Sequence, residues 1–185
     1  MTMTYRLRPL YILGGYLSAT CLVLICALIT AQIIGRIVDL VATALGGERI
    51  GLAIPGLAEI SGFLLVGATF LGLAYTFIHG AHIRVTLLIG RLPARRRVYV
   101  EAACLSVALA LCLYLTFYTY RLLADSIAFG ETSYGLLSIP LWLPQSAMLG
   151  GIVLLCLALG EAWWQALAAA ARHPEAFTLD DGSPE

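Results

Sequence analysis

Four stretches without a formal charge constrain this 185-residue chain more than any other feature. Three of them run over residues 10–35, 60–78 and 102–120, and the fourth runs over residues 132–160. A helix that crosses the hydrocarbon core of a bilayer needs about 20 predominantly apolar residues. Each stretch satisfies that requirement, so the sequence predicts an all-α membrane protein with four transmembrane helices.

Prolines and tryptophans refine the boundaries of the last span. Pro140 and Pro144 place the start of this helix near residue 141, because proline suits a first helical turn. Trp142 and Trp163 then lie about 32 Å apart at a rise of about 1.5 Å per residue, close to the hydrocarbon thickness of about 30 Å. The predicted spans are 10–35, 59–80, 98–121 and 141–164, inside one domain over 1–172 that is followed by a polar tail, 173–185.

The composition excludes an ordinary soluble domain. Hydrophobic residues make up 61% of the chain and charged residues 12%, against about 45–50% and about 25% in soluble proteins. The length allows a few spans with short connections but no second globular domain. Arg6 and Arg8 precede the first apolar run, as in a signal peptide, but the run exceeds the usual 7–15 residues and we expect it to remain as a span. Nothing indicates a nucleic-acid partner.

The arginines predict the orientation, since cytoplasmic loops are enriched in basic residues. One side of the membrane would hold eight of the eleven basic residues and the other side three, with both chain termini on the richer side. We therefore expect both termini, and the tail, to be cytoplasmic. The richer side holds Arg6, Arg8, Arg84, Arg91, Arg95, Arg96, Arg97 and Arg172, and the poorer side holds Arg36, Arg49 and Arg121.

The segment HGAHIRVTLL, residues 79–88, interrupts the apolar pattern with two histidines and an arginine. A haem between spans needs histidines on facing helices, and spans one, three and four contain none. His79 and His82 have no nearby carboxylate or cysteine to complete a metal shell, and no nucleophile for catalysis. Two interpretations stay open: a helix end that reaches lipid headgroups, or a specific contact of His82 and Arg84 with another helix or subunit.

The five cysteines all fall inside predicted spans, without a C-x-x-C or other ligand spacing. We interpret them as small apolar packing residues rather than as a zinc or disulfide framework. The sequence thus predicts no catalytic, metal or cofactor site.

From Glu59 onward, EISGFLLVGATFLGLAYTFIHGAHIRVTLLIGRLP resembles the second span and following loop of the small, DctQ-type membrane subunit of TRAP (tripartite ATP-independent periplasmic) transporters. The resemblance covers residues 10–165. Its features are Glu59 at the head of the span, Gly72 within it, the exit motif His82-Ile83-Arg84-Val85, Leu87, Leu92-Pro93 before a basic cluster, Gln32 and Arg36 at the end of span one, and SIPLWLPQSAMLGG at the entry to span four.

The chain departs from the family pattern in three places. It has Gly56 where the family usually has Trp, and Thr86 where the family has an acid after the H-I-R-V motif. The connection from Arg36 to Glu59 is also longer than usual. Apolar residues in RIVDLVATALGG recur at helical spacing, so we expect a short interfacial helix between spans one and two that ends at Gly46-Gly47; an ordered loop is the alternative.

The resemblance implies an accessory or scaffold subunit, not an enzyme. In such systems a periplasmic solute-binding protein captures the solute, a large multi-span subunit carries it in sodium-driven alternating access, and the small subunit braces the large one in the bacterial inner membrane. The charges of this chain lie at span ends, so no solute path is visible within it. A membrane anchor of a redox enzyme and a small self-sufficient carrier remain as alternatives.

Three groups of residues are candidate contacts. Small residues let helices approach closely in lipid, and the stripe of Ala68 and Gly72 could serve the internal bundle or the large subunit. Arg36 and Glu59 fall on one side of the membrane and could pair, whereas His82 and Arg84 lie at the opposite end. Candidate contacts to phospholipid headgroups are Arg95, Arg96, Arg97, Trp142, Trp163 and Trp164, and candidate contacts to the binding protein are Arg49, Asp125 and Glu131.

Overall fold

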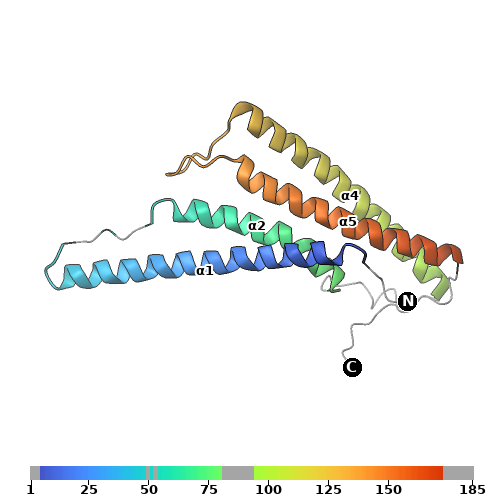
Figure 1. The fold of residues 1–185 in the computed structure, drawn as a ribbon, viewed down its shortest axis with the longest axis horizontal. Helices are drawn as coiled ribbons and strands as arrows, with labels where there is room; N and C mark the ends of the chain where they lie inside the picture. Colours follow the sequence, from blue (N-terminus) through green and yellow to red (C-terminus); the bar gives the residue numbers. More distant parts are fainter. Residues whose placement is uncertain (1–4, 49–50, 52–53, 81–93, 173–185) are drawn as a thin grey trace, which may run out of the picture.

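The computed structural model describes residues 5–48, 51, 54–80 and 94–172. Within these ranges the chain is helical, without β-strands apart from an isolated bridge between Thr132 and Pro140. Four helices in the described part are long and apolar enough to cross a membrane, which confirms the predicted all-α architecture of four spans. They are α1 (Arg8–Ala44), α2 (Leu57–Ile78), α4 (Ala94–Phe129) and α5 (Trp142–Arg172), shown in Figure 1.

The first helix corrects the expectation of a separate interfacial helix. Residues 36–44 are helical, but they continue α1 without a break after Gly35. The helix ends where the glycines predicted: Gly46 has a φ of 78°, and the Gly47 N–H donates to the carbonyl of Ala42 over 2.9 Å. This is the hydrogen-bonding pattern of a Schellman motif, in which glycine adopts the left-handed conformation at low cost. A single glycine at position 35 weakens a helix by only about 1 kcal/mol and does not end it.

Helices α1 and α4 are longer than a bilayer requires. Helix α1 has 37 residues and α4 has 36, and each is therefore about 55 Å long at about 1.5 Å per residue. The hydrocarbon core is about 30 Å thick. Part of each helix must therefore tilt within the membrane or extend beyond it.

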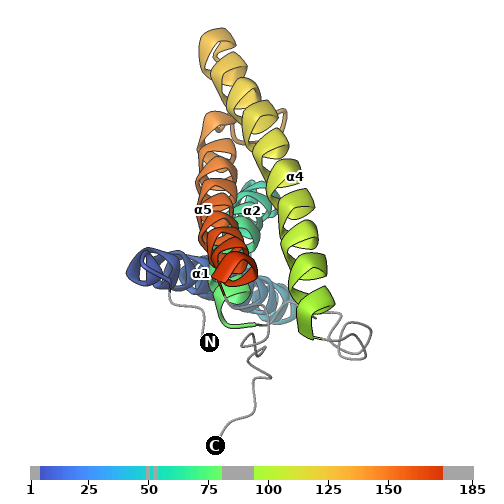
Figure 2. The ribbon, with the colours of Figure 1, turned by 90° about the vertical axis from the view of Figure 1, so that its right-hand side faces the viewer.

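The helices lie side by side in the order α1, α2, α5, α4 (Figure 1). The successive pairs α1–α2 and α4–α5 are antiparallel, and α2 and α5 run in the same direction (Figure 1). Figure 2 shows α1 and α4 on opposite sides of the central helices. Helix α1 contacts mainly α2, so most of its circumference is open.

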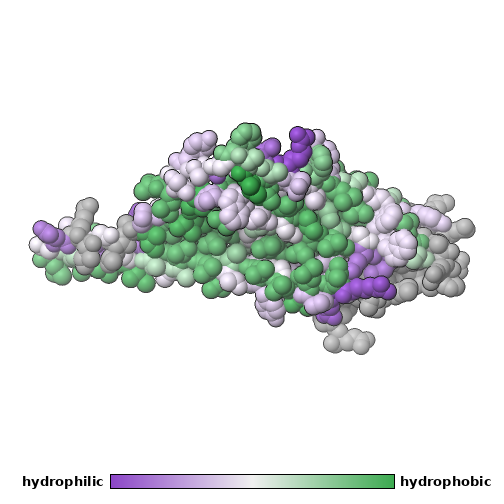
Figure 3. All heavy atoms as spheres, turned by 45° about the horizontal axis from the view of Figure 1, so that its top comes forward, coloured by the Kyte–Doolittle hydropathy of each residue, from purple (hydrophilic) through white to green (hydrophobic). Residues whose placement is uncertain are grey.

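Two clusters of buried side chains hold this arrangement together. One joins α1, α2 and α5 around Tyr11, Ala74 and Ala158. The other joins α4 and α5, with a contribution from α2, around Cys112 and Ile152. Outside these clusters the surface is largely apolar: between residues 15 and 34 no residue of α1 is buried. On the face shown in Figure 3, apolar residues cover the middle of the bundle.

Candidate functional site

Helices α1 and α2 meet at the stripe of small residues in span two. The Ser18 hydroxyl donates a hydrogen bond to the backbone carbonyl of Ala68 over 2.5 Å. A Cβ added at Gly72 would lie 2.9 Å from the Ser18 Oγ, so the close approach requires glycine. The structure thus brings Ala68 and Gly72 against α1 of the same chain, while their contact with a large subunit stays a prediction.

Helices α2 and α5 approach closely at Gly151. A Cβ at this position would overlap the backbone of Phe70, whereas a Cβ at the adjacent Gly150 would meet nothing within 4 Å. On α1, Gly14 lies opposite the Leu71 carbonyl at the same level. Glycines on two helices therefore let α1 and α5 pack on the backbone of α2, and the doubled glycine after Leu149 is the sequence signal for it.

Helices α4 and α5 are joined by sulfur and hydroxyl groups. The Cys156 Sγ lies 2.9 Å from the Cys112 Sγ and 3.3 Å from the Thr116 hydroxyl. All five cysteines are free thiols, and Cys112 is buried. Toward the end of α5, the Trp163 indole N–H donates to the Ser106 hydroxyl over 2.6 Å. Neither the Cys112–Cys156 pair nor the Ser106–Trp163 pair could be predicted from the sequence, because several residues in each span have the same spacing and are equally suitable partners.

Glu59 occupies a junction at the start of α2. Its carboxylate accepts a hydrogen bond of 3.3 Å from the backbone N–H of Leu137, in the connection between α4 and α5. Gly135 lies so close to the same carboxylate that a Cβ there would overlap it. Arg36 is exposed on α1, and the described contacts of Glu59 are to this connection rather than to Arg36.

Gln32 ties the α1–α2 connection to α1. Its side-chain Oε1 accepts a 2.7 Å hydrogen bond from the backbone N–H of Ile54, shortly before α2 begins. A second bond, of 3.2 Å, joins the Gly51 N–H to the Asp39 carboxylate. Gln32 and Asp39 thus accept hydrogen bonds from backbone N–H groups of the connection, which have no partner within a helix.

Glu161 has the corresponding role at the opposite end of the bundle. Its carboxylate oxygens, on α5, accept hydrogen bonds from the backbone N–H groups of Arg6 (3.0 Å) and Leu7 (3.3 Å), just before α1. The first N–H groups of a helix lack partners within the helix and carry a partial positive charge. The N–H groups of Arg6 and Leu7 directly precede α1, so the Glu161 carboxylate satisfies them beside the positive end of that helix. In the sequence, Glu161 is recognisable only as a single acidic residue after an uncharged span. This pattern does not identify the N–H groups that it binds.

The aromatic candidates for lipid contact differ in their surroundings. Trp142, at the first residue of α5, and Trp164 are exposed, at 43% and 70%. Trp163 turns toward α4 and bonds Ser106 instead. The structure does not describe the side chains of Arg95, Arg96 and Arg97, which belong to the first turn of α4. His82 and Arg84 lie outside the described residues.

The candidates for contact with the binding protein lie around the end of α4. Asp125 is exposed on α4. Glu131 is exposed as well, and its carboxylate accepts a 2.6 Å bond from the Ser126 hydroxyl, which orders the start of the α4–α5 connection. Arg49 lies outside the described residues.

The polar groups of the described chain serve helix ends and helix contacts. Within that part, no three histidine, cysteine or acidic side chains gather where they could hold a metal ion. Four apolar helices with close contacts inside the membrane, and with polar junctions at both ends, define a multi-pass α-helical membrane protein.

The chain matches the family model of the DctQ component of the tripartite ATP-independent periplasmic transporters over residues 25–169. It belongs to this family and is a small membrane subunit of the TRAP type, that is, a transporter component. This confirms the resemblance that the sequence indicated. No curated protein and no solved structure matches the chain.

Proposed function

We propose that the chain braces the large membrane subunit of a TRAP transporter during sodium-driven uptake of a solute that a periplasmic binding protein delivers. Family membership supports the assignment to such a system. The observation that carries the bracing role is the exposed apolar face of α1 away from α2, since no residue of this helix between residues 15 and 34 is fully buried. Such a surface lies against either lipid or another membrane protein.

A brace needs a rigid connection between its contact surface and the rest of its body. Helix α1 is attached to α2 by the Ser18–Ala68 hydrogen bond and to α5 through Glu161. A moving domain transports solute only relative to a fixed one, and an added helical bundle enlarges the fixed body and its contact with lipid. The outer face of α1, with Val23 exposed at 66%, is the surface that we assign to the large subunit.

The orientation in the bacterial inner membrane is part of the proposal. With the arginine-rich side cytoplasmic, both termini face the cytoplasm, and the connections α1–α2 and α4–α5 face the periplasm. There Arg36, Asp125 and Glu131 are available to an arriving binding protein. Each of these residues is exposed.

The proposal is tested by reconstituting the large subunit and the binding protein in liposomes with and without this chain. A sodium gradient should drive uptake of the solute that the binding protein carries only when this chain is present. Undiminished uptake without the chain would refute the bracing role.

A second measurement tests the assigned surface. A photo-cross-linking amino acid at Val23 should form an adduct with the large subunit, and one at Leu111, exposed on α4 at 64%, serves as the comparison. If only the photo-cross-linking amino acid at position 111 formed an adduct, the surface that contacts the large subunit would lie on α4 instead of α1.

A further inference from the structure

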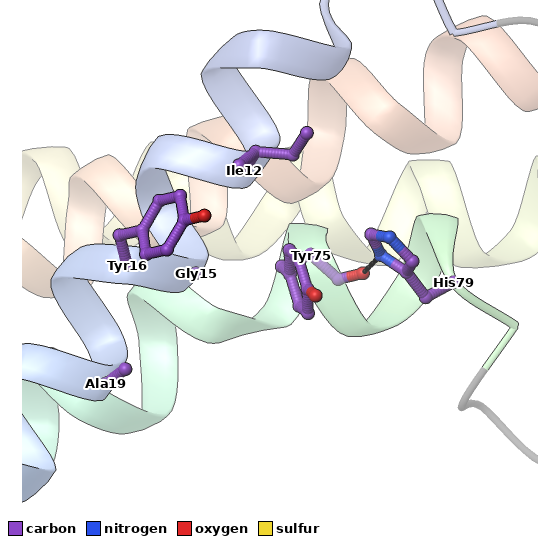
Figure 4. A pocket seen from close by; sticks show the side chains of 6 residues that line it. All are labelled: Ile12, Gly15, Tyr16, Ala19, Tyr75 and His79. Atoms are coloured by element: carbon purple, nitrogen blue, oxygen red, sulfur yellow. Dashed lines mark hydrogen bonds between the residues drawn. The ribbon is translucent and has the colours of Figure 1, made fainter.

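A groove of about 330 Å³ opens between α1 and α2 near the end of the bundle where α1 begins. Figure 4 shows Tyr16 on the α1 side and Tyr75 and His79 on the α2 side of this groove. The remaining lining residues are Ile12, Gly15 and Ala19 of α1. Its volume lies at the lower end of the range that is usual for small-molecule sites, about 300–1,000 Å³.

The walls of the groove are held in place without a ligand. The Tyr75 ring lies against Gly15, where a Cβ would stand only 2.7 Å from the ring. The His79 ring stacks on Tyr75 with 4.1 Å between centroids. The His79 Nδ1 lies 2.8 Å from the Tyr75 carbonyl oxygen, which fixes the ring further. The hollow exists because Gly15 and Ala19 place little or no side chain between the two tyrosines.

The groove extends from a polar boundary into the apolar part of the membrane. Arg8 is exposed one helical turn before Ile12, on the face of α1 that lines the groove, since residues four apart share a face. From Arg8 to Ala19 the helix rises by about 16 Å, which is about half of the 30 Å hydrocarbon thickness. The lining residues of α1, from Ile12 to Ala19, cover about 10 Å of this rise, and Arg8 lies beyond them toward the start of the helix.

We propose that this groove binds one phospholipid with an anionic headgroup, of the phosphatidylglycerol class. Its phosphodiester pairs with the Arg8 guanidinium, and an acyl chain lies along Ile12 and Ala19 between the tyrosine rings. None of the lining residues is acidic; the acidic group that the described residues place near Arg8 is Glu161, whose carboxylate is engaged by the backbone N–H groups of Arg6 and Leu7. The proposal stands independently of the transport role.

His79 gives the headgroup a second contact. The Tyr75 carbonyl only accepts hydrogen bonds, so the His79 Nδ1 donates to it and the Nε2 is the ring nitrogen that remains for a ligand. A glycerol headgroup offers hydroxyl donors to such a nitrogen, whereas a choline headgroup has no donor. The groove should therefore prefer phosphatidylglycerol to phosphatidylcholine.

The test uses the full chain reconstituted in phosphatidylcholine vesicles that contain a small fraction of phosphatidylglycerol with a photoactivatable acyl chain. Mass spectrometry of the cross-linked peptides should place adducts on α1 and α2 around Tyr16 and Tyr75. Ala19→Phe fills the groove from an exposed position and should reduce these adducts several-fold. Ala27→Phe, at an exposed α1 position outside the groove, should leave them unchanged.

The headgroup is tested with the matched phosphatidylcholine probe and with the variants Arg8→Gln and His79→Gln. The wild-type chain should give several-fold more groove adducts with phosphatidylglycerol. His79→Gln should lose most of this preference, whereas Arg8→Gln should reduce the adducts of both probes, because both lipids carry the phosphodiester. Equal labelling by the two probes in the wild-type chain, or equal labelling of Ala19→Phe and Ala27→Phe, would overturn the proposal.

Discussion

The Ser18 hydroxyl of α1 donates a hydrogen bond of 2.5 Å to the backbone carbonyl of Ala68 in α2. This carbonyl belongs to a helix interior, so Ser18 adds a bond between helices where both partners are shielded from water. Gly72, one turn further along α2, makes room for the same hydroxyl. Ser18 and Gly72 therefore contribute, together with Gly14 against the Leu71 carbonyl, to the close approach of α1 and α2.

Removing this hydroxyl should weaken the α1–α2 pair modestly. For Ser18→Ala we expect a loss of about 0.6 kcal/mol, and at most about 1.7 kcal/mol, as found for polar contacts between membrane helices. Gly72→Leu should cost more, because it pushes α1 away from α2. Thermal unfolding of the purified chain in detergent measures both effects. Gly62→Leu is the control, since nothing lies within 4 Å of a Cβ there; equal losses for Gly62→Leu and Gly72→Leu would contradict the close contact.

The adjacent glycines of α5 provide a sharper comparison. Gly151→Leu should destabilise the chain by about 1–3 kcal/mol or more, because the side chain must displace the backbone of α2. Gly150→Leu should have little effect on the isolated chain, as it projects into open space. The difference in unfolding midpoint between the two variants is the measurement. Indistinguishable midpoints would mean that α2 and α5 do not approach at Gly151.

The carboxylate of Glu161 should stabilise the start of α1. Glu161→Ala removes the acceptor for two backbone N–H groups, and a hydrogen bond typically contributes about 0.5–1.5 kcal/mol to stability. Hydrogen exchange at the amides of Arg6 and Leu7 should accelerate, while exchange in the middle of α5 should be unchanged. If exchange at Arg6 and Leu7 were the same in wild type and variant, the two hydrogen bonds would have no energetic role.

The two neighbouring tryptophans should respond differently to the same substitution. Trp163→Phe removes the hydrogen bond to Ser106 and should lower the unfolding midpoint, whereas Trp164→Phe, at a largely exposed ring, should hardly change it. Ser106→Ala should reproduce the loss and should add little to Trp163→Phe, as expected for two partners of one bond. Full additivity of the two losses would exclude a shared bond.

The predicted orientation is checked by labelling from each side of the membrane. In a chain without native cysteines, a cysteine at position 94 should react only from the cytoplasm. A cysteine replacing Tyr134, which is fully exposed in the α4–α5 connection, should react only from the periplasm. The opposite pattern would reverse the assignment of both termini.

The sequence predicted the four long apolar helices of the described residues well, because a long stretch without charge has few alternatives to a membrane-spanning helix. It predicted helix ends less well. Hydropathy limits a helix only within the bilayer, so α1 continues past Arg36 to Ala44 and α4 continues past Arg121 to Phe129. Gly46 was the more reliable signal, since a left-handed residue ends a helix in any solvent.

Contacts between helices were much harder to predict than the helices themselves. Every span contains small residues at four-residue spacing, so the pattern alone does not pair Gly151 with Phe70 or Ala68 with Ser18. Glu161 could have been interpreted as another charge at a span end, and only the path of the chain brings it to Leu7. The DctQ family was identified from motif order, which is independent of these pairings.

The order α1, α2, α5, α4 has a consequence for biogenesis. Each outer helix packs mainly on its neighbour in the sequence, so the chain consists of two antiparallel hairpins that meet along α2 and α5. Contacts between sequence neighbours require little loop-closure entropy. The first hairpin can therefore form its α1–α2 contact as soon as it leaves the translocon, whereas its contacts with α5, at Gly151, Ala158 and Glu161, wait for the second half of the protein to be synthesised.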